Sequence, residues 1–466
     1  MVYSIKDSDV EKYIDLVKCE LSDRERFVYI ATFGCQQNEA DSEKMLGIAK
    51  LMGYNPTDDP QLADLVIFNT CAIREHAEEK ALSMLGRFKG LRAQKPELIV
   101  GVVGCMAAEP HRAEMLKRDF HYVSFTLEPN MIHRLPEMVA KKMLENKRSF
   151  IFGEDKGDIH EGTPISRREK HRAWVSIMYG CNNFCSYCIV PYVRGRERSR
   201  NSADIIEECK ALIAQGVREI TLLGQNVNSD RSDIDFPELL RRIASIEGDF
   251  LLRFMTSHPK DTSDMLIDAF AEFSPKIAPY FHLPLQSGSN RVLKLMNRTY
   301  TKEQFLQIVG KLRARVPNVS LSTDIIVGFP TESKEDFDET MDVLRTVRFD
   351  MVYSFLYSPR VGTVAAKMDG AVSRDDKNSR MAELLAMQDE ISLEKNLPYE
   401  GQVFRVLVDS FENRGGEVIY TGRTETNKLV HFRGEDVKIG DFAYVEIEKA
   451  QPFDLIGKKK EGYKND

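Results

Sequence analysis

Three short apolar runs in the first third of the chain each end just before a cysteine. They are residues 28–33 before Gly34 and Cys35, residues 63–68 before Asn69, Thr70 and Cys71, and residues 98–103 before Gly104 and Cys105. Amphipathic patterns separate the runs, and this alternation is typical of parallel βα units. Residues just past the ends of parallel strands gather along the carboxyl edge of the sheet. We therefore expect Cys35, Cys71 and Cys105 to converge on one crevice.

Length and composition limit the class of protein. A chain of 466 residues is longer than one hydrophobic core normally organises, so two to four domains are expected. No apolar stretch approaches the roughly 20 residues of a membrane span, and the first residues are too polar for a signal peptide. We therefore expect a cytoplasmic protein, in which eight cysteines indicate metal binding or catalysis before disulfides. A net charge of −7 excludes a uniformly basic surface but leaves room for a local basic track.

The patterns predict an α/β protein with three structured domains. A short helix over residues 10–21 lies in an N-terminal extension, residues 1–26. A parallel-sheet βα domain follows over 27–145, then a charged linker over 146–172. A second βα series over 173–398 has six candidate strands and a last helix over 389–396, which fits a partial (β/α)6 barrel. Residues 399–466 alternate in short β runs, as in a small β-barrel, at 402–409, 417–423 and 442–447. The six barrel strands are predicted at residues 173–178, 218–223, 251–256, 279–283, 319–327 and 351–357.

A second group of cysteines, Cys181, Cys185 and Cys188, lies in one loop after the first predicted barrel strand. A [4Fe–4S] cluster needs four ligands, so three thiolates leave one iron open. S-adenosylmethionine (SAM) can bind that iron through its amino and carboxylate groups, and reduction then yields methionine and a 5′-deoxyadenosyl radical. The alternative is a structural zinc site with a remote fourth ligand.

The first three cysteines suggest a further cluster. One cysteine at such a place is usually a small buried apolar residue. Three at equivalent places in successive βα units favour a second cluster with its own open iron, suited to carrying an extra sulfur. The other two cysteines, Cys19 and Cys209, lie on predicted helical faces and are expected to pack.

Four segments resemble the radical SAM methylthiotransferase family, and the resemblance covers nearly the whole chain. They are residues 32–43, 179–200, 282–289 and 323–330. The C-terminal part is similar to a TRAM domain, an RNA-binding barrel. Within the family, Gln36, Gln37 and Asn38 and the arginine run after Cys188 are closest to the branch that modifies tRNA, which usually has Gln-Met-Asn at the triplet.

The resemblance implies a tRNA methylthiotransferase that acts at C2 of N6-isopentenyladenosine at position 37, using two SAM molecules per turnover. One SAM would methylate sulfur at the auxiliary cluster of Cys35, Cys71 and Cys105, and the other would be cleaved at the cluster of Cys181, Cys185 and Cys188. A tRNA anticodon stem-loop, a flavodoxin- or ferredoxin-like electron donor and a sulfur source are the implied partners, and a monomer suffices. The alternatives are a ribosomal-protein aspartate or N6-threonylcarbamoyladenosine tRNA as substrate, and an iron–sulfur RNA-binding redox regulator.

Supporting residues are predicted from strand ends and charge. Candidates for SAM binding are Asn182, Tyr187, Gln225, Asn226, Ser257 and Gln286. Each of these has an alternative as a turn or capping residue, and His258 and His282 are expected to be hydrogen-bonded structural residues. Candidates for RNA binding are Arg194, Arg196, Arg198, Arg200, Arg405, Arg423, Lys428 and Arg433. The alternative for this group is a set of solvated loop charges; phosphate steering is favoured because the first four follow the cysteine loop.

Overall fold

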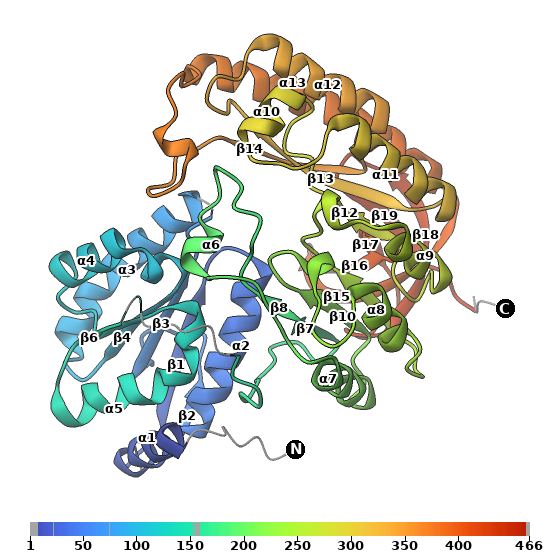
Figure 1. Ribbon diagram of the computed structural model, residues 1–466. Helices are drawn as coiled ribbons and strands as arrows, with labels where there is room; N and C mark the ends of the chain where they lie inside the picture. Colours follow the sequence, from blue (N-terminus) through green and yellow to red (C-terminus); the bar gives the residue numbers. More distant parts are fainter. Residues whose placement is uncertain (1–7, 22, 74, 152, 154–158, 463–466) are drawn as a thin grey trace. The chain divides into compact units, whose positions relative to one another are not determined.

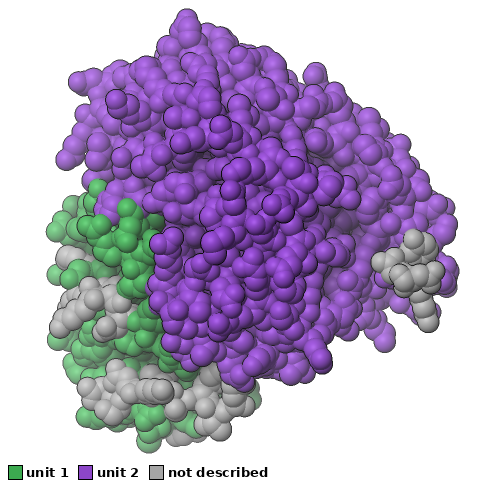
Figure 2. Space-filling model, turned by 45° about the vertical axis from the view of Figure 1, so that its right-hand side comes forward, with its two compact units in different colours: residues 1–168, 179–182, 188–198 green, residues 169–178, 183–187, 199–466 purple. Residues whose placement is uncertain are grey.

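The computed structural model describes residues 8–21, 23–73, 75–151, 153 and 159–462. It divides into two compact units (Figure 2). Unit 1 is 1–168 with 179–182 and 188–198, and unit 2 is 169–178 with 183–187 and 199–466. The predicted extension, linker and C-terminal domain each include residues outside the described ranges, namely 1–7 and 22, 152 and 154–158, and 463–466. Among the described residues, no helix is long and apolar enough to cross a membrane.

Unit 1 is built on a six-stranded parallel sheet. Its order is β2 (Tyr54–Pro56), β1 (Arg26–Thr32), β3 (Leu65–Thr70), β4 (Ile99–Gly104), β5 (Phe125–Leu127) and β6 (Ser149–Phe150). The sequence predicted β1, β3 and β4. The other three have only two or three residues each, too few for a period-two pattern, and β6 falls inside the predicted linker.

Helices cover both faces of this sheet (Figure 1). One hydrophobic cluster joins it to α1 (Ser8–Glu20), α2 (Gln36–Leu51) and α5 (Leu135–Glu145), and another joins it to α3 (Glu75–Gln94) and α4 (Pro110–Asp119). Strands β3 and β4 are buried throughout, as expected for a sheet covered on both sides. The strand order reverses between β1 and β3, which is where ligands bind in doubly wound sheets.

Unit 2 contains the predicted (β/α)6 partial barrel. Its strands are β7 (Arg172–Ser176), β10 (Glu219–Leu223), β11 (Leu251–Phe254), β12 (Tyr280–His282), β13 (Ser320–Val327) and β14 (Met351–Leu356). They form two parallel three-stranded sheets, β11-β10-β7 and β12-β13-β14. Leu252 of β11 also makes a parallel bridge with Ile277, a residue shortly before β12. All six strands were predicted, and the fold class is confirmed.

The barrel helices are α7 (Ser202–Ala214), α8 (Phe236–Ala244), α9 (Asp264–Glu272), α10 (Asn290–Leu295), α11 (Lys302–Arg315), α12 (Lys334–Val347) and α13 (Arg374–Asn396). The cap of α7 is Asn201, whose side chain accepts from the Ala203 amide. Helix α13 begins at Arg374, well before residue 389, because Ser373 caps a polar, exposed first half that has no apolar stripe. Two short strands, β8 (Met178–Tyr179) and β9 (Arg198–Ser199), flank the cysteine loop along the chain.

The chain ends in a closed five-stranded barrel. Its order is β15 (Val403–Arg414), β16 (Glu417–Thr424), β17 (Leu429–Arg433), β19 (Leu455–Lys459) and β18 (Phe442–Ala450). The sequence predicted β15, β16 and β18 but missed the two five-residue strands. Buried ionic contacts tie this barrel to the rest of unit 2: Arg253 donates to the carbonyl of Thr424, and Lys428 pairs with Asp350 at 2.8 Å.

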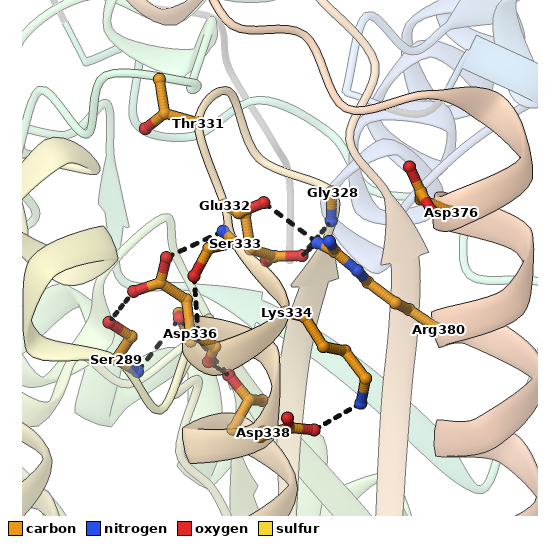
Figure 3. Close-up of polar contacts among 12 residues, drawn as sticks. Ser289, Gly328, Thr331, Glu332, Ser333, Lys334, Asp336, Asp338, Asp376 and Arg380 are labelled. Carbon is orange, nitrogen blue, oxygen red and sulfur yellow. Dashed lines mark hydrogen bonds and ion pairs between the residues drawn. The ribbon is translucent and has the colours of Figure 1, made fainter.

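A polar network fixes the turn that follows β13 (Figure 3). One carboxylate oxygen of Glu332 accepts from the Gly328 amide at 2.9 Å and from the Arg380 guanidinium at 2.7 Å. Asp336 accepts from the Ser333 amide at 2.8 Å and from the Ser289 hydroxyl at 2.6 Å, which links α12 to the start of α10. Burial raises the pKa of Glu332, so Arg380 is the partner that favours its ionised form.

Candidate active site

The structure brings Cys35, Cys71 and Cys105 to the carboxyl ends of three adjacent strands in unit 1. Cys35 follows β1 and caps the N-terminus of α2, Cys71 follows β3, and Cys105 begins the 3-10 helix η1 (Cys105–Ala108) after β4. Cys71 and Cys105 are each only 1% exposed.

Two glycines allow these ends to approach closely. A side chain on Gly34 would lie 2.4 Å from the Cβ of Cys71, and one on Gly104 would lie 2.4 Å from the carbonyl oxygen of Thr70. Both glycines have positive φ, 108° and 99°. The backbones before Cys35 and Cys105 therefore press against the end of β3, where only glycine fits without displacement.

A buried arginine completes this group. Arg194 is 2% exposed, and its Nη2 lies 2.8 Å from both Asn38 Oδ1 and Asp41 Oδ2. The Asn38 amide in turn donates to the carbonyls of Phe33 and Thr70, which joins the ends of β1 and β3. Arg194 also lies close enough to Cys105 for its charge to lower the pKa of that thiol. The three cysteines thus share a buried environment with one guanidinium and one carboxylate.

The charges in this environment are coupled. Burial raises the pKa of the Cys105 thiol to about 12, and the nearby Arg194 opposes that shift. Burial alone would lower the pKa of Arg194, but Cys105 and Asp41 hold it well above its ordinary value. The guanidinium is therefore a permanent cation beside the thiols. Metal binding would deprotonate these thiols, because the thiolate is the form that binds a metal.

Part of the cysteine loop belongs to unit 1. The amide of Cys181 donates to Gly195 O at 3.2 Å, and the side chain of Asn182 accepts from the Glu197 amide at 3.3 Å. The short helix α6 (Val190–Val193) follows Cys188. Ile189 and Val193 form an apolar cluster with Ala72 and Cys105, so this segment covers one of the first three cysteines.

The middle of the loop, residues 183–187, belongs to unit 2. There the Arg298 guanidinium donates to the sulfur of Cys185 at 3.4 Å. Tyr187 packs against an apolar cluster that includes Met296 and Phe329, so its ring is held at the carboxyl end of the barrel strands.

Two of the residues predicted for SAM binding have buried polar atoms without a partner. Asn226 follows β10 and Ser257 follows β11; Asn226 Oδ1 and Ser257 Oγ make no hydrogen bond in the structure. A buried polar atom left unpaired costs about 1–3 kcal/mol, so these atoms point to a missing ligand group. Two non-glycine residues with positive φ also follow barrel strands: Thr256, at 66°, comes after β11, and Gln286, at 73°, comes after β12. Such strain clusters at ligand sites.

The remaining strand-end residues are mostly held by the protein itself. The Gln225 amide donates to Met178 Sδ, and the Gln286 amide donates to the Asp324 carbonyl. Burial lowers the pKa of His258 to about 2, so its ring is neutral and accepts from the Lys260 amide. His282 bonds Ser322 at 2.9 Å. Both histidines have the structural hydrogen bonds that were expected.

Three of the eight cations predicted to bind RNA are buried and paired within the protein. Arg194 is buried as described above, Arg200 donates to Ser176 O and Glu208, and Lys428 is 9% exposed in its ion pair with Asp350. The sequence could not show these partners, because it does not show which carboxylates or carbonyls lie near an arginine or lysine in the folded protein.

The other five cations vary in exposure. Arg405 lies over the Phe442 ring and pairs with Asp249, while Arg423 and Arg198 are partly buried and donate to carbonyl or amide oxygens. Arg196 is exposed, and the Arg433 side chain is 51% exposed. Arg196 and Arg433 are therefore the ones best placed to meet a phosphate.

Sequence reasoning missed two residues of the site. Asp41 lies in a helical pattern with no sign that it faces a buried arginine, and Arg298 lies in a turn after α10. Only spatial proximity to the cysteines identifies them.

Three family models match consecutive parts of the chain. An uncharacterised protein family, UPF0004, matches residues 27–127, the Radical SAM superfamily matches 175–344, and the TRAM domain matches 398–460. Two relatives, from Thermoanaerobacter sp. (strain X514) and Clostridium botulinum (strain Langeland), are 44% and 46% identical over 96% and 92% of this chain and 95% and 96% of their own. Both are named tRNA-2-methylthio-N(6)-dimethylallyladenosine synthase. The chain belongs to the radical SAM methylthiotransferase family.

Solved structures agree on the fold of this methylthiotransferase. The radical SAM methyltransferase TsrM from Kitasatospora setae superimposes with a TM-score of 0.54 at 14% identity, over 74% of this chain and 77% of its own. At that identity the likeness concerns the fold alone.

Membership in the radical SAM family implies a [4Fe–4S] cluster and SAM, and the methylthiotransferase has residues that fit them. Among the described residues, no three His, Cys, Asp or Glu side chains converge as they would around a single metal ion. A cluster does not require this, because each thiolate binds a different iron. The open loop of three cysteines, the unpaired Asn226 and Ser257 atoms and the strained strand ends fit a cluster with SAM beside it.

Proposed function

We propose that the chain inserts a methylthio group at C2 of N6-isopentenyladenosine at position 37 of tRNA, using two [4Fe–4S] clusters and two SAM molecules per turnover. The names of relatives at 44–46% identity support the tRNA substrate. The observation that carries the proposal is the placement of Cys35, Cys71 and Cys105 at the ends of three adjacent strands, in a radical SAM enzyme that already has a separate three-cysteine loop.

The proposed ligands divide into two sets. Cys181, Cys185 and Cys188 would hold the cluster that, when bound, supplies the electron for cleavage of SAM. Cys35, Cys71 and Cys105 would hold an auxiliary cluster that supplies the sulfur. The C2–H group of adenine is neither acidic nor electrophilic, so no acidic or basic side chain of the protein can break this bond. Cofactors must therefore supply the radical chemistry.

The chain's own residues would bind and orient SAM and exclude water from the site. Asn226 and Ser257 offer buried polar atoms to SAM, and Tyr187 offers an aromatic face held by the Met296 and Phe329 cluster. Ile189 and Val193 shield Cys105 from solvent, which protects sulfur chemistry from hydrolysis. Arg194 supplies fixed positive charge beside the anionic thiolates.

Iron content tests the two-cluster proposal. Reconstituted wild-type protein is expected to hold about eight irons per chain, and the triple variant Cys35→Ala, Cys71→Ala, Cys105→Ala about four. The triple variant at Cys181, Cys185 and Cys188 is also expected to hold about four. Changing Cys19 and Cys209 to alanine is the matched control and should leave the iron content unchanged. Four irons in the wild type would rule out the auxiliary cluster.

Mass spectrometry of tRNA nucleosides tests the substrate. Cells lacking the gene are expected to accumulate N6-isopentenyladenosine without its methylthio derivative, and the wild-type gene should restore the derivative. Neither triple cysteine variant should restore it. If the derivative persists in cells without the gene, a ribosomal-protein aspartate or threonylcarbamoyladenosine becomes the leading substrate.

The C-terminal barrel offers a surface for the tRNA backbone. Arg433 and Arg414 line an open groove of about 410 Å³, together with His431. Changing Arg433 or Arg196 to glutamine is expected to weaken tRNA binding and to lower the slope of log affinity against log salt by about 1 for each phosphate that is no longer bound. Arg345→Gln, an exposed cation on α12, is the control and should leave the slope unchanged. An unchanged slope in both test variants would exclude these two phosphate contacts.

A further inference from the structure

Four arginines are buried among the described residues, and one of them has no acidic partner. Arg194, Arg200 and Arg253 pair with Asp41, Glu208 and Glu219 at 2.6–2.9 Å. Arg298 is 9% exposed, and within the described part of the chain no aspartate or glutamate lies within ion-pair distance of it. An unpaired buried charge is strongly unfavourable, so Arg298 requires an anion that no described carboxylate provides.

The position of Arg298 identifies where that anion must be. Its Nη1 lies 3.4 Å from Cys185 Sγ. Its Nε lies 2.9 Å from the Tyr300 hydroxyl and its Nη2 lies 2.9 Å from Pro284 O. The Tyr300 hydroxyl is itself fixed on the Leu285 carbonyl at 2.7 Å. Neutral groups therefore occupy two sides of the guanidinium, and the third faces a cysteine sulfur.

Arg298 is not needed to shape the cysteine loop. The Ser186 amide and hydroxyl donate to the carbonyls of Met296 and Leu295, at 3.0 and 2.8 Å. The Asn297 amide group donates to the carbonyl of Phe184 at 3.0 Å, and the Ala365 amide donates to Ser186 O at 2.7 Å. Because these bonds dock residues 183–187 on the turn after α10, the guanidinium adds charge at a site that is already formed.

We propose that Arg298 acts through the sulfur of Cys185 and raises the reduction potential of the cluster bound through that cysteine. This rests on the proposed assignment of Cys185 as a cluster ligand. Reduction adds one electron to the cluster, and no proton or bond change accompanies it; a low-potential one-electron donor supplies the electron. The reduced cluster carries one more negative charge than the oxidised cluster. A fixed cation hydrogen-bonded to a ligand sulfur therefore stabilises the reduced form more.

The test is a redox titration followed by electron paramagnetic resonance. It uses the full chain with Cys35, Cys71 and Cys105 changed to alanine, so that one cluster gives the signal, and dithionite as reductant. Arg298→Gln is expected to disfavour reduction about tenfold, which is about 59 mV more negative for a one-electron couple. Arg298→Lys keeps the charge but not the planar fork, so a smaller lowering is expected. Lys294→Met, which removes an exposed cation on α10, should leave the potential unchanged.

Each outcome decides the proposal. A lowered potential in either loaded Arg298 variant supports it. If Arg298→Gln does not retain a cluster, Arg298→Lys decides, and a wild-type potential there overturns the proposal. The titration is run with and without SAM, because the SAM carboxylate is another candidate anion. A shift seen only with SAM would assign the guanidinium to SAM and overturn the cluster assignment.

The result is separable from the proposed function. No iron at Cys181, Cys185 and Cys188 in the parent protein would contradict the proposed function and, with it, this inference. A loaded cluster with an unchanged potential would contradict this inference alone.

Discussion

Replacing Arg194 with methionine is expected to destabilise unit 1 by about 3–5 kcal/mol, because it leaves the buried Asp41 carboxylate without its cation. For a unit of this size, each kcal/mol lowers the melting temperature by about 2–4 °C. Thermal unfolding of the metal-free full chain measures the change. Arg196→Met removes an exposed arginine two residues along the chain and should leave the melting temperature almost unchanged.

The same substitution is expected to remove the proposed auxiliary cluster. Arg194 lies near Cys105 and donates to Asn38, and Asn38 ties the ends of β1 and β3. Iron content should fall from about eight to about four per chain, while the signal of the other cluster is kept. The double variant Arg194→Met, Asp41→Leu should recover most of the stability, because both charges are then absent, but not the iron. Wild-type stability and iron content in the single variant would contradict this account of the site.

Replacing Arg380 with methionine is expected to destabilise unit 2 by about 3 kcal/mol, because Glu332 is then buried with only the Gly328 amide as a partner (Figure 3). Lys334→Met is the matched control. Lys334 and its partner Asp338 are more than half exposed, so removing that cation should cost less than about 1 kcal/mol.

Hydrogen exchange locates the effect of the Arg380 change. The Gly328 amide donates to Glu332, so its exchange is expected to accelerate in Arg380→Met and not in Lys334→Met. The turn after β13 lies beside the start of α10, through the Ser289 and Asp336 bond, and a loosened turn should also reduce SAM affinity. Equal melting temperatures for the two variants would show that Arg380 does not support the Glu332 charge.

Much of the fold could be predicted because its strands are long enough to show a pattern. Six barrel strands, three strands of the first sheet and three of the C-terminal barrel have buried or alternating residues at the predicted places. The strands that were missed have two to five residues, and β5 and β6 gain their conformation from pairing with neighbours. Local sequence carries little signal for such strands.

The cysteine pattern predicted the place of the site but not its electrostatics. Parallel strand topology alone required Cys35, Cys71 and Cys105 to lie along one edge, since residues that follow adjacent strands must meet there. The pairing of Arg194 with Asp41, 153 residues apart, depends on how α6 and α2 pack within unit 1. That packing buries Arg194 near the cysteines, whereas Arg196 of the same run stays exposed.

The sequence by itself determined the βα order, the two cysteine triads and the family, because these depend on residue type, spacing and motif. Only the tertiary structure decided which arginines are buried, which have acidic partners and which face a sulfur. Charge is long-ranged in a low-dielectric interior, so the role of Arg194 and Arg298 depends on their neighbours in space. Residues 28–33, 63–68 and 98–103 thus predicted where the first three cysteines would gather, and the packing around those cysteines supplied the counter-charge.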